Sequence, residues 1–360
     1  MATTFAVPDG RVAMAATTYT GTGATQTISN AVNTVSFQPD FVWVKRRDAV
    51  QDHNVYDSVR GSTSGYLNQL LTNQTGIENT YGSGVYGAVS ALNSSGFTVA
   101  SSNSDWRLTN NSSATYVGWQ WNAGGTTVTN GVGTISSQVR ANTTAGFSVV
   151  TYTGTLSAVG TATVGHGLGA APAMIITKAR SGVSDWNVNH VSLATWSYLC
   201  FLNTTDVALN SSANGTIVAP TNTVFTTNYS TGMNVSGVTQ VAYCWAPVAG
   251  YSAFGSYTGN NSTDGPFIYT GFRPRWLMIK GSTYVSSWII FDTSRSLYNE
   301  SKLLLYPNDS AAENTNAYGI DVLSNGFKLR QPTGYGSNNS GETYIYAAFA
   351  ENPLKYANAR

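Results

Sequence analysis

Charged side chains are scarce in this chain of 360 residues. It has 18 lysines and arginines and 17 aspartates and glutamates, or 10% of the sequence, against roughly 25% in an ordinary globular domain. The net charge of +1 offers no basic field to nucleic-acid phosphates, so we expect no nucleic-acid partner. No apolar run approaches the roughly 20 residues that cross a bilayer, so we expect no membrane insertion either.

Histidine and cysteine are also rare. Two cysteines, Cys200 and Cys244, cannot form a disulfide framework in a chain of this length. The three histidines, His53, His166 and His190, have no neighbours at metal-ligand spacing. Spacing marks no carboxylate pair of the glycosidase kind, and no G-x-S-x-G elbow is present. We therefore expect no catalytic residues, no metal and no cofactor, and a protein that is not an enzyme.

The chain is instead rich in glycine, hydroxyl and amide side chains, with 42% hydrophobic residues to build cores. Valine, isoleucine, threonine and aromatic residues cluster in short runs, which is typical of strands. Clusters of glycine, asparagine and serine separate these runs and indicate turns. No stretch has a sustained helical period of apolar residues. These patterns predict an all-β protein.

Three segments of the chain resemble one another, which indicates an internal repeat. Each begins with Tyr-Thr-Gly, at residues 19–21, 152–154 and 257–259. About twenty residues later an apolar run ends in lysine, at Lys45, Lys178 and Lys280. Each segment closes on an aromatic strand that ends at Trp121, Trp245 and Phe349. We interpret the lysines as strand ends whose ammonium groups reach solvent.

The repeat predicts three tandem β-sandwiches, jelly-roll-like and about a hundred residues each. The expected divisions are an N-terminal segment 1–18, repeat 1 at 19–122, a linker 123–146, repeat 2 at 147–250 and repeat 3 at 251–360. Within the linker, one pairing strand is expected at 134–139. The short connection between repeats 2 and 3 predicts that these two pack closely, with repeat 1 more independent.

Several phrases resemble a repeat family of tailed-bacteriophage virion proteins, often labelled tail-fibre or lectin-like. They are VRANTTAGFSVVTYTGT (139–155), VGHGLGAAP (164–172), FGSYTGN (254–260), DGPFIYTGFRP (264–274) and FAENPLKYANAR (349–360). The resemblance extends from Tyr19 to Arg360 and carries no catalytic motif. It implies a β-sandwich component of a virion surface. The first residues lack the features of a signal peptide, so we expect synthesis in a host cytoplasm without secretion.

An Asp-x-x-Arg pattern recurs in register in two of the repeats. Asp57 and Arg60 in repeat 1 match Asp292 and Arg295 in repeat 3. In repeat 2 the same positions hold His190 and Leu193. A recurring pair in a chain with so few charges predicts structural ion pairs at strand ends, which must be mutual if they are buried. A binding carboxylate is the alternative interpretation.

Aromatic residues in turn-rich context are candidates for stacking on sugar rings. They are Trp106, Tyr81, Tyr86 and Tyr335. Packing in cores or interfaces is the competing interpretation for each of them.

Together these observations favour a virion protein of a tail fibre or tail tip that contributes to attachment to host-surface glycan. Its expected partners are other virion proteins and copies of itself, with a trimer favoured because exposed sheet edges need covering. The alternative is a capsid decoration or head-fibre protein with a purely structural role. A polysaccharide depolymerase ranks third.

Overall fold

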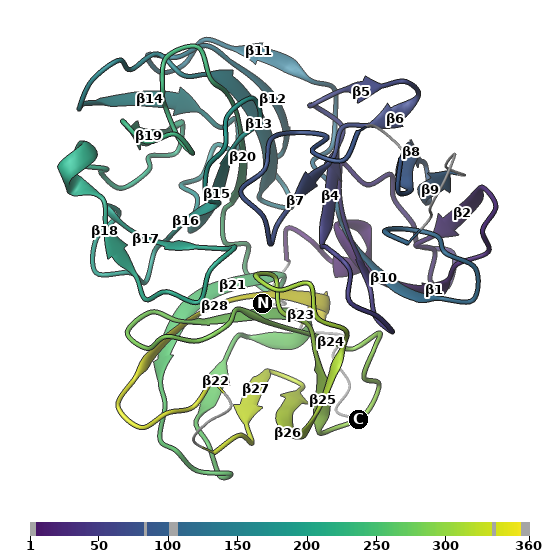
Figure 1. Cartoon of the computed structure of the whole chain (residues 1–360). Coiled ribbons are helices and arrows are strands. Elements are labelled where there is room, and N and C mark those ends of the chain that lie inside the picture. The colour runs from purple at the N-terminus through teal and green to yellow at the C-terminus, as the bar shows by residue number, and fades with distance from the viewer. Residues whose placement is uncertain (1–4, 83–84, 101–106, 333–335, 354–360) are drawn as a thin grey trace.

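The chain folds into antiparallel β-sheets that gather in three lobes around a common centre (Figure 1). A computed structural model describes residues 5–82, 85–100, 107–332 and 336–353. Over this part of the chain the only helical elements are two short 3-10 turns, η1 (Gly10–Val12) and η2 (Ser212–Asn214). No helix in these ranges is long and apolar enough to cross a membrane. The all-β prediction is confirmed.

Lobe 1, up to residue 122, has a large sheet and a smaller one. The large sheet has the order β1 (Met14–Thr20), β10 (Thr115–Trp121), β3 (Phe41–Arg46), β4 (Asn54–Asp57) and β7 (Leu70–Leu71). The small sheet has the order β2 (Gln26–Ser29), β9 (Gly96–Ala100) and β8 (Ala88–Asn93). Strands β5 (Ser62–Thr63) and β6 (Tyr66–Leu67) form a two-stranded ribbon. Because β1 begins at Met14, the boundary expected at residue 19 lies inside this strand.

Lobe 2 covers residues 123–250. Its large sheet has the order β11 (Val128–Asn130), β12 (Ser137–Asn142), β13 (Phe147–Thr153), β20 (Thr239–Trp245), β15 (Met174–Ala179), β16 (Asn187–His190), β17 (Tyr198–Phe201) and β18 (Leu209–Asn210). Strands β14 (Thr161–Gly165) and β19 (Val224–Asn228) form a separate pair. The segment expected to be a linker, 123–146, thus supplies two strands that extend this sheet.

Lobe 3 contains the described residues from 251 onward, in two four-stranded sheets. One has the order β21 (Ser252–Thr258), β28 (Thr343–Pro353), β23 (Phe272–Gly281) and β24 (Ile289–Asp292). The other has the order β22 (Phe267–Tyr269), β27 (Gly326–Leu329), β26 (Asn314–Leu323) and β25 (Ser301–Leu304).

One sheet in each lobe has the same strand order; in lobe 3 it is the sheet that contains β21, and we call it the large sheet of that lobe. The run β1-β10-β3-β4 in lobe 1 matches β13-β20-β15-β16 in lobe 2 and β21-β28-β23-β24 in lobe 3. In each lobe the closing aromatic strand pairs with the opening strand on one side and with the apolar, lysine-ended strand on the other.

The closing strands of lobes 1 and 2 each contribute to two hydrophobic cores, because successive side chains of a strand point to opposite faces. In β10, Val117, Trp119 and Trp121 join a core that draws residues from all three lobes. Tyr116 on the opposite face belongs to a core confined to lobe 1. The central core contradicts the expectation that the first repeat is the more independent one, since its tryptophans are as buried as those of the other lobes.

Gly118 lets the two sheets of lobe 1 approach closely. It lies in β10 on the face toward the small sheet, and a Cβ atom at this position would stand 2.7 Å from the ring of Phe97. Any larger residue would therefore push the small sheet away from the large one.

Candidate functional site

The two Asp-x-x-Arg segments form the same buried turn at the ends of β4 and β24. Asp57 Oδ1 accepts the backbone N–H groups of Val59 and Arg60, each at 2.9 Å. This is the local bonding that favours aspartate at turns. Arg60 Nε donates to Asp57 Oδ2, and Arg60 Nη2 donates to the carbonyl of Val55 at 2.9 Å. Neither side chain of the ion pair is exposed to solvent.

The second segment repeats this geometry. Asp292 Oδ1 accepts the N–H of Arg295 at 2.9 Å, and Arg295 Nε donates to Asp292 Oδ2 at 2.5 Å. Arg295 Nη2 donates to the carbonyl of Ile290 at 2.9 Å. Burial alone would raise the pKa of both aspartates, but the arginine beside each one outweighs it and holds the pKa below its ordinary value.

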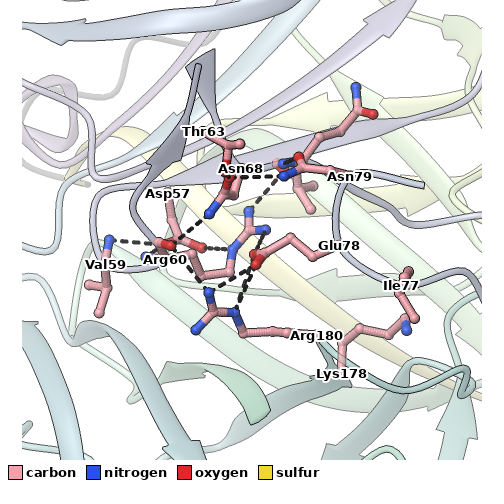
Figure 2. A network of polar contacts seen from close by, with 12 residues as sticks. Asp57, Val59, Arg60, Thr63, Asn68, Ile77, Glu78, Asn79, Lys178 and Arg180 are labelled. Carbon is pink, nitrogen blue, oxygen red and sulfur yellow. Dashed lines mark hydrogen bonds and ion pairs between the residues drawn. The ribbon is translucent and has the colours of Figure 1, made fainter. Parts of the chain in front are cut away.

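The Asp57–Arg60 pair extends into lobe 2 through a glutamate (Figure 2). Arg60 Nη1 donates to Glu78 Oε1 at 2.9 Å, and Arg180 of lobe 2 donates to Glu78 Oε2 at 2.9 Å. We call this set of four residues the Asp57 clamp.

The counterpart between lobes 3 and 1 is the Asp292 clamp. Arg295 Nη1 donates to Glu313 Oε2 at 2.9 Å, and Arg47 of lobe 1 donates to Glu313 Oε1 at 2.7 Å. Two of the three lobe junctions therefore have the same sequence of charges, aspartate to arginine to glutamate to arginine.

The third junction, between lobes 2 and 3, has a neutral histidine in place of the aspartate and arginine of a clamp. His190 holds the position of the two aspartates, and its Nε2 lies 3.1 Å from the carbonyl of Tyr346. Its Nδ1 accepts the N–H of Ser192 at 3.1 Å, so the ring proton sits on Nε2, which donates. Burial lowers the pKa of His190 to about 4. In the other two junctions Trp119 and Tyr243 donate to Asp292 and Asp57 from the adjacent lobe. Histidine fits here because the matching position in strand register is Ala347, whose side chain has no donor.

The three recurring lysines also lie at the lobe junctions, and the expectation that they reach solvent is wrong. Lys45, Lys178 and Lys280 are fully buried, and burial lowers the pKa of each to about 8. Each ammonium group donates to the carbonyl of the next residue and to one carbonyl of the adjacent lobe. The carbonyls of the adjacent lobe are Ser310 at 3.2 Å, Thr75 at 3.3 Å and Thr205 at 3.2 Å, respectively.

Two of the aromatic candidates come together on lobe 1. Tyr81 and Tyr86 are half-buried, and their rings meet edge to face with centroids 5.5 Å apart. Tyr81 donates its hydroxyl to Asp52 at 2.9 Å, and the Arg107 guanidinium covers Tyr86 at 4.3 Å from its ring centroid. These contacts leave less free ring for stacking on a ligand. The other two candidates, Trp106 and Tyr335, lie outside the described residues.

All three histidines are buried and hold structural hydrogen bonds. His53 Nδ1 accepts from Trp43 Nε1 at 3.0 Å, and His166 Nδ1 accepts the N–H of Leu168 at 3.2 Å. Burial lowers the pKa of both rings. Within the described ranges no group of three or more histidine, cysteine, aspartate or glutamate side chains is placed to hold a metal ion.

A cavity of about 400 Å³ opens in lobe 2 beside lobe 1. Its wall contains side chains of β16, β17 and β18, the η2 turn, the loop 230–232 and Thr75 of lobe 1. The sequence reasoning missed this cavity. Its lining residues come from five stretches of the chain, at residue 75 and within 183–187, 199–201, 209–214 and 230–232, and none carries a recognisable motif.

Comparison with known families gives one match. A family model described as "Domain of unknown function (DUF7483)" matches residues 12–353. This range is nearly the whole chain, so the protein belongs to that family. No curated protein matches the chain. The description of the family names no activity, ligand or partner.

Proposed function

We propose that this member of the DUF7483 family is a non-enzymatic virion protein of a tail fibre or tail tip that contributes to attachment to host-surface glycan. Its three lobes are, in this proposal, three tandem jelly-roll-like β-sandwich repeats. The shared strand order of the large sheets and the matching clamps support the repeat. The phrases that resemble tailed-phage proteins support the virion assignment.

The main support for a non-enzymatic role is the position of the clamp residues, the recurring lysines and the histidines. The Asp57 and Asp292 clamps and the three buried lysines hold charges between lobes. The histidines are buried and bonded to backbone or indole groups. General acid–base catalysis needs a group within reach of substrate, whereas recognition of a neutral glycan needs hydroxyls, amides and apolar surface.

Locating the protein in virions tests the proposal directly. We expect gold-labelled antibody against the purified chain to bind at the tail of the phage that encodes it. The purified protein should also retain host-envelope polysaccharide on a column without releasing reducing ends. Absence of label from intact virions, or release of reducing ends, would refute the proposal.

A capsid decoration or head-fibre protein is the second candidate. The exposed aromatic residues Phe267 and Tyr269 on the edge strand β22 favour it, because such surface suits contacts between proteins. Label on the capsid together with no retention of polysaccharide would select this candidate over the first.

A further inference from the structure

The cavity of lobe 2 has an apolar floor made by one face of its sheet. Asn187 lies opposite Phe201 in the β16–β17 register, and Leu199 lies opposite Leu209 in the β17–β18 register. Residues paired in this way share a face of the sheet. Leu199 also packs in a small hydrophobic cluster with Met233, and Phe201 packs against it. The floor residues are therefore held by neighbours on the cavity side of the sheet.

Above the floor most of the lining residues are amides and hydroxyls, with Val183 and Ala213 as apolar members. The amide and hydroxyl residues are Thr75, Ser184, Asn210, Ser211, Asn214, Ser230 and Thr231. Asp185 is the only residue of the lining with an ionisable side chain, and one of its oxygens accepts from Asn203 Nδ2 at 2.7 Å. The ammonium of Lys178 lies behind the wall, bonded to Ser184 Oγ at 3.3 Å. The lining therefore presents no cation to an anionic ligand.

One buried amide is left with hydrogen-bonding capacity at this cavity. Asn187 is 2% exposed and lines the cavity, yet the only hydrogen bond of its side chain runs from Nδ2 to the carbonyl of Asp185 at 3.5 Å. That distance is at the limit of a real hydrogen bond. An asparagine side chain offers two donors and an acceptor, and buried amides ordinarily have partners.

The chain makes room for this amide. Gly232 lies across the cavity wall, and a Cβ atom there would stand 2.1 Å from Asn187 Nδ2 and 2.9 Å from the carbonyl of Asp185. Only glycine lets the amide keep its position. The site thus combines a buried polar group, a glycine that accommodates it and an apolar floor.

We propose that this cavity binds an uncharged sugar of one or two rings. An apolar sugar face would pack on Phe201 and the leucines, while Asn187 and the rim amides would bond its hydroxyls. The volume of about 400 Å³ lies within the roughly 300–1,000 Å³ of small-molecule sites. Asp185 disfavours carboxylated or phosphorylated sugars. The choice of a sugar rests on the proposed attachment function.

The test is a titration of the purified full chain with lactose, maltose and diacetylchitobiose. Saturation-transfer NMR detects binding, and calorimetry measures the affinity. N-acetylneuraminic acid is the charged comparison. Gly232→Ala and Asn210→Ala alter the wall and the rim of the cavity. Gly131→Ala is the matched control, because nothing lies within 4 Å of a Cβ there. Thermal melting of each variant checks that it remains folded.

We expect at least one uncharged disaccharide to bind, about tenfold more weakly in the Gly232→Ala and Asn210→Ala variants and unchanged in the Gly131→Ala variant. Preference for the sialic acid, no binding of any uncharged sugar, or full binding by folded Gly232→Ala would overturn the proposal. Retention of polysaccharide that depends on Tyr86 and not on Gly232 would refute this site while leaving attachment intact. Sugar binding in the cavity of a protein absent from virions would support the site and refute the attachment function.

Discussion

Tyr243 of lobe 2 donates its hydroxyl to Asp57 Oδ2 of lobe 1 at 2.7 Å. Trp119 of lobe 1 donates its indole N–H to Asp292 Oδ2 of lobe 3 at 2.9 Å. Each buried carboxylate thus receives an arginine from its own lobe and a neutral donor from the next. The two carboxylates form part of the lobe junctions as well as of their own turns.

Removal of one arginine should therefore destabilise the whole chain. Arg60→Ala leaves Asp57 buried without its cation, and breaking a buried pair in this way costs about 3–5 kcal/mol. We expect a loss of this size in the free energy of unfolding, measured by urea titration with tryptophan fluorescence. Arg46→Ala is the control, because its partner Asp48 is partly exposed and such pairs contribute about 1 kcal/mol or less. Equal losses in the two variants would contradict a buried role for Arg60.

The buried histidine at the junction of lobes 2 and 3 should make the protein sensitive to mild acid. The pKa of His190 is lowered to about 4, below its ordinary value of about 6.5. Between these values the unfolded chain binds a proton that the folded chain does not, so stability falls as the pH falls from 6.5 to 4. His190→Gln keeps a donor for Tyr346 and removes the titration. We expect a shallower loss of stability in this variant over that window; equal slopes in parent and variant would disprove it.

The buried lysines at the junctions should change the stability of the protein at alkaline pH. Burial lowers the pKa of Lys178 to about 8, whereas the pKa of this lysine in the unfolded chain is about 10.4. Between these values the unfolded state holds the extra proton, so this lysine makes stability rise with pH. In Lys178→Met the free energy of unfolding should rise less between pH 8 and 10 than in the parent. The difference in slope approaches about 1.4 kcal/mol per pH unit at most. A steeper rise in the variant would contradict the burial effect.

Local patterns were enough to predict much of the fold. The short β-branched and aromatic runs predicted strands, and the strands of the recurring segments occupy matching places in the three large sheets. The Asp-x-x-Arg spacing could be interpreted because its turn closes within four residues.

The lobe junctions and the cavity could not be found in this way, because they depend on distant segments. Lys45 looked like a strand end facing water, yet its acceptor Ser310 lies 265 residues away. Asn187 and Gly232 likewise lie close together in space, although no sequence motif contains both of them. The glycine- and threonine-rich segment 123–146 predicts a linker with a single strand at 134–139, whereas it forms two strands, β11 and β12, and the second lies at Ser137–Asn142.

Self-association remains a prediction, and the structure suggests where to test it. Strand β22 forms the edge of its sheet, and Phe267 and Tyr269 are 45% and 63% exposed on it. Edge strands with apolar surface invite pairing unless a charge protects them. We expect the parent chain to sediment as a trimer at micromolar concentration and the Tyr269→Lys variant to sediment as a monomer. Tyr298→Lys, at a loop residue that is 80% exposed, should have no effect. A parent chain that sediments as a monomer would exclude the trimer.

The shared core should make the three lobes unfold together. Trp276 of lobe 3 lies at its centre, with its ring 5.3 Å from Trp121 of lobe 1 and 5.7 Å from Phe349, between centroids. Truncating such a residue to alanine costs about 3–5 kcal/mol through lost burial and the cavity left behind. Because the core belongs to all three lobes, Trp276→Ala should lower hydrogen-exchange protection in all of them.

The matched control is Trp196→Ala, since Trp196 packs only against clusters within lobe 2. Its effect on exchange should remain in lobe 2, with lobes 1 and 3 protected as in the parent. Protection of lobe 1 that survives Trp276→Ala unchanged would show that this lobe is stable by itself. The central core would then join lobes that fold separately, and the clamps would be the principal connection between them.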